Sequence, residues 1–283
     1  MFADLHLHTN FSDGTYTPEE LAGHGRRVGL KAMALTDHDT VEGCARMAVA
    51  CEGNGIEFCP GTELTAEVDG IEVHILGLFI DIANPEMQVE MAKFQDVRQK
   101  RIYEMVARLN EKKIPLKPEA VFKIANCRSP GRPHVARALV AEKYCTSLDE
   151  AFDRFLKKGK AAWVPKFKIS AFDAIKLIHI AGGLAVLAHP ALNRSDEVIP
   201  DLVRAGMDGL ECFHSKHTQH VSEHYLQIAD KHDLLVSGGS DCHGMSKNKP
   251  LIGSVKIPIH TYNKLKEARD DLRARRARRA AAV

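Results

Sequence analysis

Short apolar runs alternate with helical patterns along most of the 283-residue chain, and this alternation constrains the fold more than any other feature. The first run is "ADLHLH", a helix is predicted to begin at Pro18, and the runs "AMALTDH" and "IEFCPGTEL" follow with a second helical pattern between them. Units of this size predict parallel strands joined by helices. The runs "LTAEV" and "IEVHILGLFI" flank the hairpin dipeptide Asp69-Gly70, so we expect a local antiparallel pair there.

The alternation stops in the middle of the chain. From about residue 86 to about residue 165, charged helical patterns follow one another without strands and break at "KIPLKP" and "CRSPGRPH". Strand and helix patterns then resume with "LAVLAHP", "GLECFH" and "LLVSGGSDCH". We therefore predict an α/β barrel domain made of residues 1–85 and 166–283, with residues 86–165 inserted as a helical cap domain.

Composition limits the class of protein. Hydrophobic residues make up 45% and charged residues 27%, as in soluble globular domains. The formal net charge of +2 argues against a surface that coats nucleic acid, and we interpret the basic run "RDDLRARRARRAAAV" as the solvated face of a last helix. Seven cysteines without a C-x-x-C pair favour reduced thiols, and the sequence shows neither a signal peptide nor an apolar stretch of membrane length. We expect a cytoplasmic protein that does not bind membranes.

Side chains that could bind metal ions gather at the C-terminal ends of the predicted strands, where α/β barrels bind ligands. Because side chains alternate along a strand, His6 and His8 share one face. The same alternation places Asp241 and His243 together and turns Cys242 away. The candidate ligands are six histidines and three carboxylates: His6, His8, His38, His74, His189, His243, Asp13, Glu63 and Asp241.

This ligand set predicts the number and the kind of ions. Nine ligands are too many for one tetrahedral ion, so we expect two or three divalent ions. Since the set contains nitrogen and oxygen donors and no thiolate, manganese, iron and zinc are all compatible with it. We take Mn²⁺ as the first choice, with Fe²⁺ or Zn²⁺ as alternatives.

The motifs resemble those of the PHP (polymerase and histidinol phosphatase) phosphoesterases, which belong to the wider amidohydrolase group. The resemblance rests on "DLHLHTNFSDG", "LTDHDT", "PGTELT", the histidine of "VHILGL", "LAHP" and "GSDCH", which occur in the family's order. It implies a distorted (β/α)7 TIM-like barrel with a trinuclear metal site. By this resemblance the first ion is held by His6, His8, Glu63 and Asp241, the second by Glu63, His74 and His189, and the third by Asp13, His38 and His243.

Within the family, the cap and its segment "GRPHVARALV" resemble the branch that acts on small nucleotides and short RNA. This resemblance implies a phosphoric monoester hydrolase that removes the 3'-phosphate of 3',5'-bisphosphonucleotides, for example converting adenosine 3',5'-bisphosphate to AMP. Three divalent ions, three carboxylates and one hydroxide leave a charge of about +2, which attracts a terminal phosphate. We expect attack by a metal-bridging hydroxide, with Glu63 as the ligand that bridges two ions.

Two further roles are assigned to residues outside the ligand set. His217, just beyond "GLECF", is a candidate proton donor to the leaving group, although a surface histidine fits its position equally well. A second phosphate needs cations and donors away from the metals, since arginine binds phosphate through paired hydrogen bonds. The candidates are Arg128, Ser129, Arg132, His134 and Lys166, although an Arg-Pro-His sequence also simply begins a helix.

Other functions compete with this hypothesis. A 5'-to-3' exonuclease on short RNA oligonucleotides or a histidinol-phosphate phosphatase would use the same site, and an open groove would favour the nuclease whereas a small closed pocket would favour the monoesterase. Outside enzymes, an accessory domain of a polymerase predicts missing ligand positions, whereas all of them are filled in this sequence. We expect a small nucleotide or a short oligonucleotide as the binding partner and no obligatory protein partner.

Overall fold

The computed structural model describes residues 1–193, 196–247 and 249–281, and it begins with the alternation that the sequence predicts. The β1–β2 and β2–β3 pairs are both parallel. The first helix is α1, whose N-terminus is fixed by a capping box between Thr17 and Glu20 with Pro18 at the first helical position. The elements of this part are β1 (Phe2–Asp4), α1 (Pro18–Arg27), β2 (Leu30–Leu35), α2 (Cys44–Gly53) and β3 (Glu57–Val68).

The predicted antiparallel pair is present. Strand β3 turns directly into β4 (Ile71–Leu78), and the pairing continues to Val68 opposite Ile71. Asp69 and Gly70 at the turn have φ values of 50° and 79°, a left-handed conformation that favours the Asp-Gly dipeptide. The runs expected as two strands before this turn form the single long strand β3.

The second part of the barrel repeats the parallel arrangement. Strands β6, β7 and β8 pair in parallel, and β6 lies antiparallel to β4. The elements are β5 (Ile169–Ser170), α7 (Ala171–Ile180), β6 (Leu184–Leu187), α8 (Pro190–Asn193), a 3-10 turn η2 (Asp196–Val198), α9 (Ile199–Arg204), β7 (Gly209–His214), α10 (Gln219–Lys231), β8 (Leu235–Gly239), a 3-10 turn η3 (Gly244–Lys247), β9 (Ile257–Pro258) and α11 (Ile259–Ala281).

The sheet closes nearly completely on itself. Its strand order is β8-β7-β6-β4-β3-β2-β1-β9, and the chain beyond β1 meets the chain at and beyond β8. The Leu5 amide donates to the Gly238 carbonyl at 3.1 Å, and the His8 amide donates to the Cys242 carbonyl at 3.0 Å. Seven strands, β1 to β4 and β6 to β8, therefore form a barrel in which only β4 runs against the others. The prediction of a distorted barrel of this kind is confirmed.

Alternate residues of the strands face two different hydrophobic clusters, as a period of two requires. In β2, Ala32 and Ala34 belong to one cluster, whereas Met33 and Leu35 belong to the other. The second cluster includes residues of α1, α2 and α7, so it lies between the sheet and its outer helices. The first cluster fills the inside of the barrel, and Tyr262 of α11 closes it.

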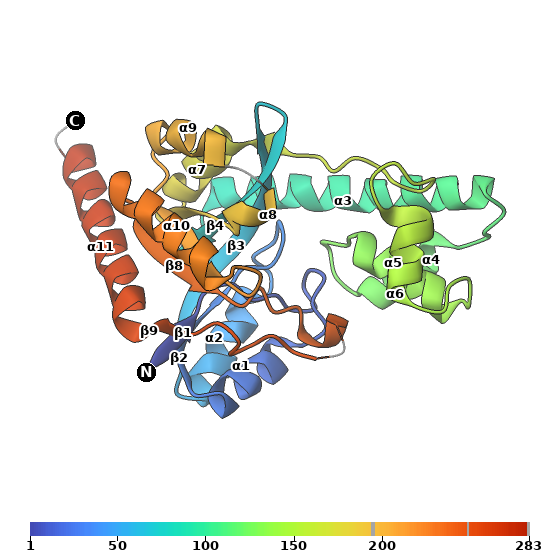
Figure 1. Cartoon of the computed structure of the whole chain (residues 1–283), viewed down its shortest axis with the longest axis horizontal. Helices are drawn as coiled ribbons and strands as arrows, with labels where there is room; N and C mark the ends of the chain where they lie inside the picture. The colour runs from blue at the N-terminus through green and yellow to red at the C-terminus, as the bar shows by residue number, and fades with distance from the viewer. Residues whose placement is uncertain (194–195, 248, 282–283) are drawn as a thin grey trace.

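Residues between β4 and β5 form helices that lie to one side of the barrel (Figure 1). The first half of the long helix α3, including Phe94, packs in the cluster between the sheet and its outer helices. Its second half packs with α4 and α5 in a separate cluster between Ile102 and Val164. This separate cluster supports the division at residues 86–165, which stays a prediction. The elements are α3 (Pro85–Glu111), α4 (Pro118–Ala125), α5 (Arg132–Ala141), α6 (Leu148–Ala151) and the π-helical turn η1 (Phe152–Leu156).

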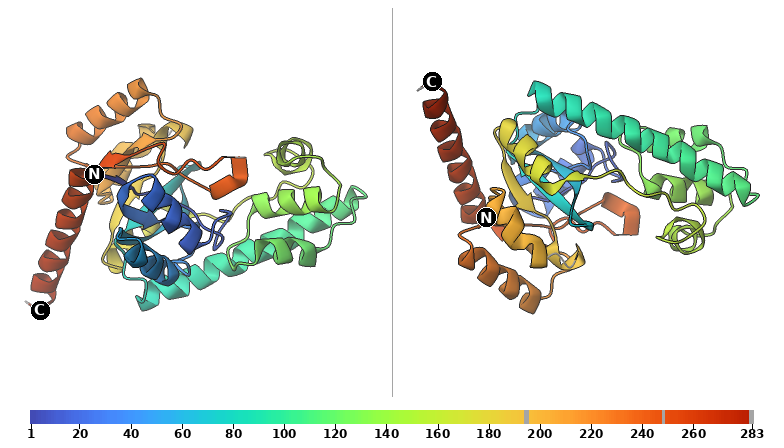
Figure 2. Two further views of the ribbon diagram at one scale, coloured as in Figure 1. Left: turned by 90° about the horizontal axis from the view of Figure 1, so that it is seen from below. Right: turned by 90° about the horizontal axis from the view of Figure 1, so that it is seen from above.

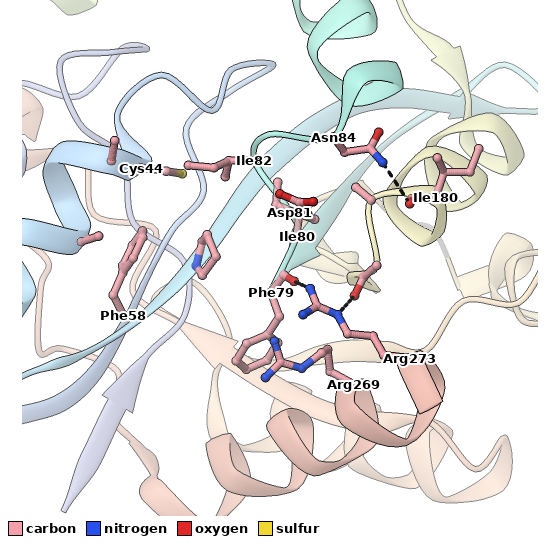
Figure 3. A pocket seen from close by; sticks show the side chains of 15 residues that line it. Cys44, Phe58, Phe79, Ile80, Asp81, Ile82, Asn84, Ile180, Arg269 and Arg273 are labelled. Carbon is pink, nitrogen blue, oxygen red and sulfur yellow. Dashed lines mark hydrogen bonds between the residues drawn. The ribbon is translucent and has the colours of Figure 1, made fainter. Parts of the chain in front are cut away.

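The opposite end of the molecule is formed by α11, which leaves the barrel beside the N-terminus (Figure 2). A cavity of about 510 Å³ lies there between α11, the start of β3 and the end of β4 (Figure 3). Arg273 donates to the carbonyls of Gly182 and Phe79, and the Arg269 guanidinium lies over the Phe79 ring. These arginines therefore attach α11 to the base of the barrel.

Two further properties bear on the class of protein. None of the helices in the described ranges is both long and apolar enough to span a bilayer. All seven cysteines are free thiols, and Cys127 is more exposed than the other six, which are buried. Burial raises the pKa of the Cys44 thiol to about 12, so this side chain packs as a small apolar group.

Candidate metal centre

All nine predicted metal ligands lie together at the C-terminal end of the parallel strands. They form four overlapping groups in which the possible ligand atoms lie within 4.8 Å of one another. The groups are His8, Asp13, His38 and His243; His6, His8 and Asp241; His6, Glu63 and His189; and His38, Glu63 and His74. Shared members join the four groups into one cluster, and their role as ligands stays a proposal.

Glu63 occupies the centre of this cluster and is 1% exposed. Its position follows from β3, which continues past the end of β2, so that the Asp37 carbonyl accepts from the Glu63 amide at 3.1 Å. Five imidazoles contact its carboxylate. From Oε2, His6 Nε2 and His8 Nε2 lie at 3.3 Å and His38 Nδ1 at 3.0 Å; from Oε1, His74 Nδ1 lies at 2.6 Å and His189 Nε2 at 3.0 Å.

His6 and His8 lie on one face, as the sequence predicts, and their rings are 5.1 Å apart. Asp241 reaches both, with its Oδ1 at 3.6 Å from His6 Nε2 and at 3.2 Å from His8 Nε2. Asp241 and His189 have φ values of 53° and 29°, which side chains other than glycine rarely adopt. Backbone strain of this kind is found at functional sites, where the surrounding structure enforces it.

A third part of the cluster lies nearer the surface. His243 Nε2 is 3.1 Å from Asp13 Oδ1, and His38 Nε2 is 4.0 Å from the same atom. The side chains of Asp13, His38 and His243 are 14%, 15% and 21% exposed, whereas His6 and His8 are fully buried. This group therefore forms the mouth of the centre.

The charges of the cluster favour a bound cation. Burial alone raises the pKa of the Glu63 carboxyl, but the imidazoles around it, His38 first, hold this pKa well below its ordinary value. The same holds for Asp13, where burial raises the pKa but His243, His38 and His8 together lower it further. Burial also opposes a proton on His38 and lowers its pKa well below the ordinary value. The carboxylates also raise the pKa of other imidazoles of the cluster, that of His243 to about 10, so a bound cation would replace the protons that these rings otherwise hold.

Several buried polar atoms of the cluster have no hydrogen-bond partner among the described residues. They include His8 Nε2, Asp13 Oδ1 and His38 Nδ1, which lie within 3.3 Å of another polar atom of the cluster but without the geometry of a hydrogen bond. An unpaired buried polar atom is costly, and several that converge on one point are the pattern expected of metal ligands. The residues present therefore fit a group of divalent cations.

Buried carboxylates outside the ligand set orient the ligands, and sequence reasoning missed them. Glu211 Oε1 lies 2.9 Å from His6 Nδ1, and its Oε2 accepts from the His189 amide at 2.7 Å. Asp37 accepts from the Thr9 amide at 2.7 Å, which shapes the loop that carries Asp13. Such partners fix the ring orientation and tautomer of a ligating histidine. The inward alternation of residues along "GLECFH" was the signal that could have identified Glu211.

His214 was also missed, although it ends β7 as the other candidates end their strands. Its Nε2 lies 3.4 Å from Asp241 Oδ2 and is buried without a hydrogen bond among the described residues. Its ring centre is 5.4 Å from that of His189. The signal of a strand-end histidine was present in the sequence, but the role at this strand was assigned to His217.

His217 lies behind His214, with its ring 5.3 Å from the His214 ring and 5.4 Å from that of Tyr225. Its Nδ1 is 3.0 Å from the Cys212 carbonyl, which requires the proton on Nδ1. Burial lowers the pKa of His217, so the neutral ring is favoured. The assignment as a proton donor stays a prediction, and these contacts do not favour it.

Three of the predicted substrate residues are engaged with the protein itself. Arg128 is 57% exposed and pairs with Glu42 at 3.2 Å. Ser129 is buried and its Oγ donates to the His38 carbonyl at 2.6 Å. His134 accepts from the Gly131 amide at Nδ1, and burial lowers its pKa to about 4.

The other two predicted substrate residues belong to a cationic cluster between the cap and the centre. Lys166 Nζ lies 3.5 Å from His74 Nε2 and 2.9 Å from Glu72 Oε1. Burial first, and then the nearby Arg132 and Arg98, lower the pKa of Arg101 to about 10. This cationic seam is formed by Arg98, Arg101, Arg132 and Lys166. Arg98 pairs with Asp39 and Lys166 pairs with Glu72, so the net positive charge of the seam comes from the other two arginines. Arg98 and Arg101 were not predicted, since only the packing of α3 brings them here.

Comparisons with known proteins agree with this arrangement. The PHP domain matches residues 4–160. A 5'-3' exoribonuclease of Haemophilus influenzae is 33% identical over 267 residues, covering 90% of this chain and 97% of that one. A 3',5'-nucleoside bisphosphate phosphatase of Chromobacterium violaceum is 33% identical over 258 residues, covering 88% and 90%. The crystal structure of a protein assigned as a metal-dependent phosphoesterase, from Bifidobacterium adolescentis, has a TM-score of 0.86 and 34% identity, covering 93% and 94%.

The barrel, its ligand cluster and these matches define a metal-dependent hydrolase of phosphate esters. The chain belongs to the PHP domain family and is a phosphoesterase of that family. The resemblance found in the sequence motifs is therefore confirmed at the level of the family. The polymerase-accessory alternative, which requires missing ligands, is not supported by a cluster that contains all nine.

Proposed function

We propose that this phosphoesterase removes the 3'-phosphate of 3',5'-bisphosphonucleotides, such as adenosine 3',5'-bisphosphate, which would yield AMP. The observation that carries the proposal is the cationic seam beside the ligand cluster. The cluster would bind the reacting phosphate, and the seam would bind a second phosphate on the same molecule. The bisphosphate phosphatase of Chromobacterium violaceum, which covers most of the chain, supports the same substrate class.

The nine ligand residues would hold two or three divalent ions, with Mn²⁺ as the first choice. Bound ions would supply positive charge for the reacting phosphate and lower the pKa of water. Glu63 would join the two sides of the cluster, since imidazoles from both sides contact its two oxygens. Lys166 Nζ lies 3.5 Å from Nε2 of the proposed ligand His74, so Lys166 would neutralise charge on the reacting phosphate.

The seam would orient the substrate. Arg132 is half-buried, donates weakly to the Leu156 carbonyl at 3.4 Å and keeps further N–H donors for a ligand. Burial lowers the pKa of both Arg132 and Lys166, and an anion bound between them would remove that penalty. A substrate without a second charged group would make no use of Arg132.

A 5'-to-3' exonuclease activity on short RNA is the second candidate. The exoribonuclease of Haemophilus influenzae matches a slightly larger share of this chain than the bisphosphate phosphatase does. Both activities place a phosphate ester at the ions and a second phosphate away from them. They differ in the bond that breaks, which is a terminal monoester in one case and an internal diester in the other.

Phosphate release and nucleotide products distinguish the two candidates. The chain loaded with Mn²⁺ is incubated with adenosine 3',5'-bisphosphate, with a 5'-phosphorylated RNA of a few nucleotides and with an aryl phosphate. We expect kcat/KM to be highest for the bisphosphate, with AMP and inorganic phosphate as products. Glu63→Gln, prepared in the same way, is the control for contaminating phosphatases. Faster release of nucleoside monophosphates from the RNA would overturn the proposal in favour of the exonuclease.

The proposed setting of the protein follows from the same features. A nucleotide substrate and free thiols fit a reducing compartment such as the cytoplasm. We propose that the activity needs no second protein, since all nine candidate ligands and the cationic seam come from one chain.

A further inference from the structure

The cap touches the metal centre at two of its ligands, through their backbone rather than their side chains. The Ser129 hydroxyl donates to the His38 carbonyl at 2.6 Å, and Arg137 Nη2 donates to the Asp13 carbonyl at 2.7 Å. Cys127 Sγ lies 3.4 Å from the Ser12 carbonyl, which strengthens the second attachment. Asp13 and His38 belong to one group of possible ligands, together with His8 and His243.

A second set of contacts holds the loop that follows His38. Arg98 of α3 donates from Nε to Asp39 Oδ2 at 2.8 Å, and its Nη2 lies 2.6 Å from the same oxygen. Asp39 has a φ of 50°, in the left-handed region that aspartate adopts more readily than most residues other than glycine. The Asp39 carboxylate also accepts from the Thr65 amide at 2.9 Å, so Arg98 ties the cap helix to β3 as well.

Arg98 also reaches into the cap. Its Nη1 lies 3.4 Å from the carbonyl of Pro130, two residues before α5 begins at Arg132. Gln95, one turn earlier on α3, donates to Thr40 Oγ1 at 3.1 Å. The loop that carries His38 is therefore held between α3 and the segment before α5. Its position depends on how the cap packs against the barrel.

The other ligands are held differently. Among hydrogen bonds of the described residues, none joins residues 86–165 to His6, Glu63, His189 or Asp241. His6 and His189 are supported by Glu211 of β7, which belongs to the barrel. The direct hydrogen bonds from residues 86–165 to proposed ligands, among the described residues, are thus those to the carbonyls of Asp13 and His38.

We infer that Arg98 and Arg137 are positioning residues through which the cap sets the metal affinity of the Asp13, His38 and His243 group. Neither residue ligates an ion. Arg137 holds the backbone of Asp13, and Arg98 holds the loop that follows His38; the side chains of Asp13 and His38 are proposed ligands. A ligand that is not held in place binds its ion more weakly. This inference rests on the proposed metal centre, and it adds that one of the ions is bound jointly by the barrel and the cap.

The direction of the change in Mn²⁺ affinity distinguishes a purely electrostatic role of these arginines from a positioning role. Removal of an arginine near a site for dications strengthens the binding of a cation if only charge matters, because the repulsion falls. Removal of a positioning residue weakens it, because the ligands lose their arrangement. Arg98→Met and Arg137→Met remove the charge and the hydrogen bonds while keeping much of the side-chain volume, so the direction of the change separates the two roles.

The test is titration of the chelator-stripped protein with Mn²⁺, with free Mn²⁺ followed by electron paramagnetic resonance. We expect Arg98→Met and Arg137→Met to bind one equivalent about tenfold to a hundredfold more weakly than the unmodified chain, with the other equivalents unchanged. Arg137→Lys, which keeps the charge and a donor, should recover part of the affinity. Arg108→Met is the matched control, since Arg108 also lies on α3 but donates to the Trp163 carbonyl within the cap.

Unchanged or tighter Mn²⁺ binding in both variants would overturn the inference. Thermal unfolding in chelator checks that the variants fold, and if Arg137→Met does not, Ser129→Ala tests the same group through the His38 carbonyl. The titration is independent of substrate. If the unmodified chain releases no phosphate from a bisphosphonucleotide, the proposed function fails while the titration still decides the role of the cap.

Discussion

The two sides of the metal centre differ in how the chain holds them. On the barrel side, His6, Glu63 and His189 are buried, and Glu211 supports two of them. On the cap side, Asp13 and His38 lie on loops beyond the strands, are partly exposed, and have their backbones tied to the cap. Residues of the barrel therefore support one half of the candidate centre, whereas the backbone of the other half is hydrogen-bonded to the cap.

Glu63 belongs to both sides, so its replacement should have the largest effect. Glu63→Gln keeps the shape of the side chain but removes the charge that five imidazoles contact. We expect kcat for phosphate esters to fall by at least about a thousandfold, or about 4 kcal/mol of barrier. Phosphate release by the Mn²⁺-loaded variant measures this, with thermal unfolding as a check of the fold. Near-normal kcat in a folded variant would show that Glu63 does not join the two sides.

Arg132 should matter for the substrate rather than for the ions. We expect Arg132→Ala to lower kcat/KM for a 3',5'-bisphosphonucleotide by roughly 2 to 4 kcal/mol, because a partly buried charge pair with the second phosphate is lost. An aryl phosphate has no second phosphate, so its kcat/KM should change much less. Arg154→Ala, which removes an exposed arginine of the cap, is the control. Equal losses on both substrates would place Arg132 at the reacting phosphate or in the fold.

Glu211 tests the barrel side alone. In Glu211→Gln, the carboxylate that faces His6 Nδ1 becomes an amide, so the orientation and basicity of that imidazole change. We expect Mn²⁺ affinity to fall by about tenfold to a hundredfold at a different equivalent from the one affected by Arg137→Met. Titration of the single variants and of their combination measures this, with Glu223→Gln on the exposed face of α10 as control. Loss of the same equivalent in both would mean that the centre has no separate sides.

The smallest expected effect is on the pH dependence of the free energy of unfolding, through His134 of the cap. The pKa of His134 in the folded chain is about 4, below its ordinary 6.5, because burial disfavours the charged ring. The unfolded chain therefore takes up a proton that the folded chain does not, so stability is complete above about pH 6.5 and falls as the pH drops toward about 4. We expect the free energy of unfolding in chelator to fall by about 1 to 2 kcal/mol more in the unmodified chain than in His134→Gln between about pH 7 and pH 5. Urea unfolding measures it, and identical pH dependence would contradict it.

The barrel side was predictable from the sequence because its signals are local. Alternation along a strand placed His6 with His8 and Asp241 with His243, and the strand-end rule gathered the remaining ligands. The Asp69-Gly70 turn likewise fixed the reversal of β4. Each of these inferences needs only a few neighbouring residues and the general geometry of strands.

The sequence predicted Asp13 and His38 as candidate ligands, but it did not predict the hydrogen bonds between their loops and the cap, because these bonds join distant parts of the chain. Arg98 meets Asp39 across 59 residues, and Arg137 meets Asp13 across 124. These pairs depend on the angle at which α3 crosses the barrel, which helix periodicity does not determine. His214 was not predicted for a different reason. It ends a strand as the other candidates do, but the histidine chosen near the end of β7 was His217, as the proton donor.

We propose that the nine side chains form one centre for more than one divalent ion. The most direct measurement is elemental analysis of the unmodified chain after reconstitution with Mn²⁺ and removal of free ions. The ligand groups share Glu63, His6, His8 and His38, so we expect more than one equivalent of bound manganese per chain. One equivalent or less would contradict the account, because a single ion cannot engage ligands from both sides of the centre.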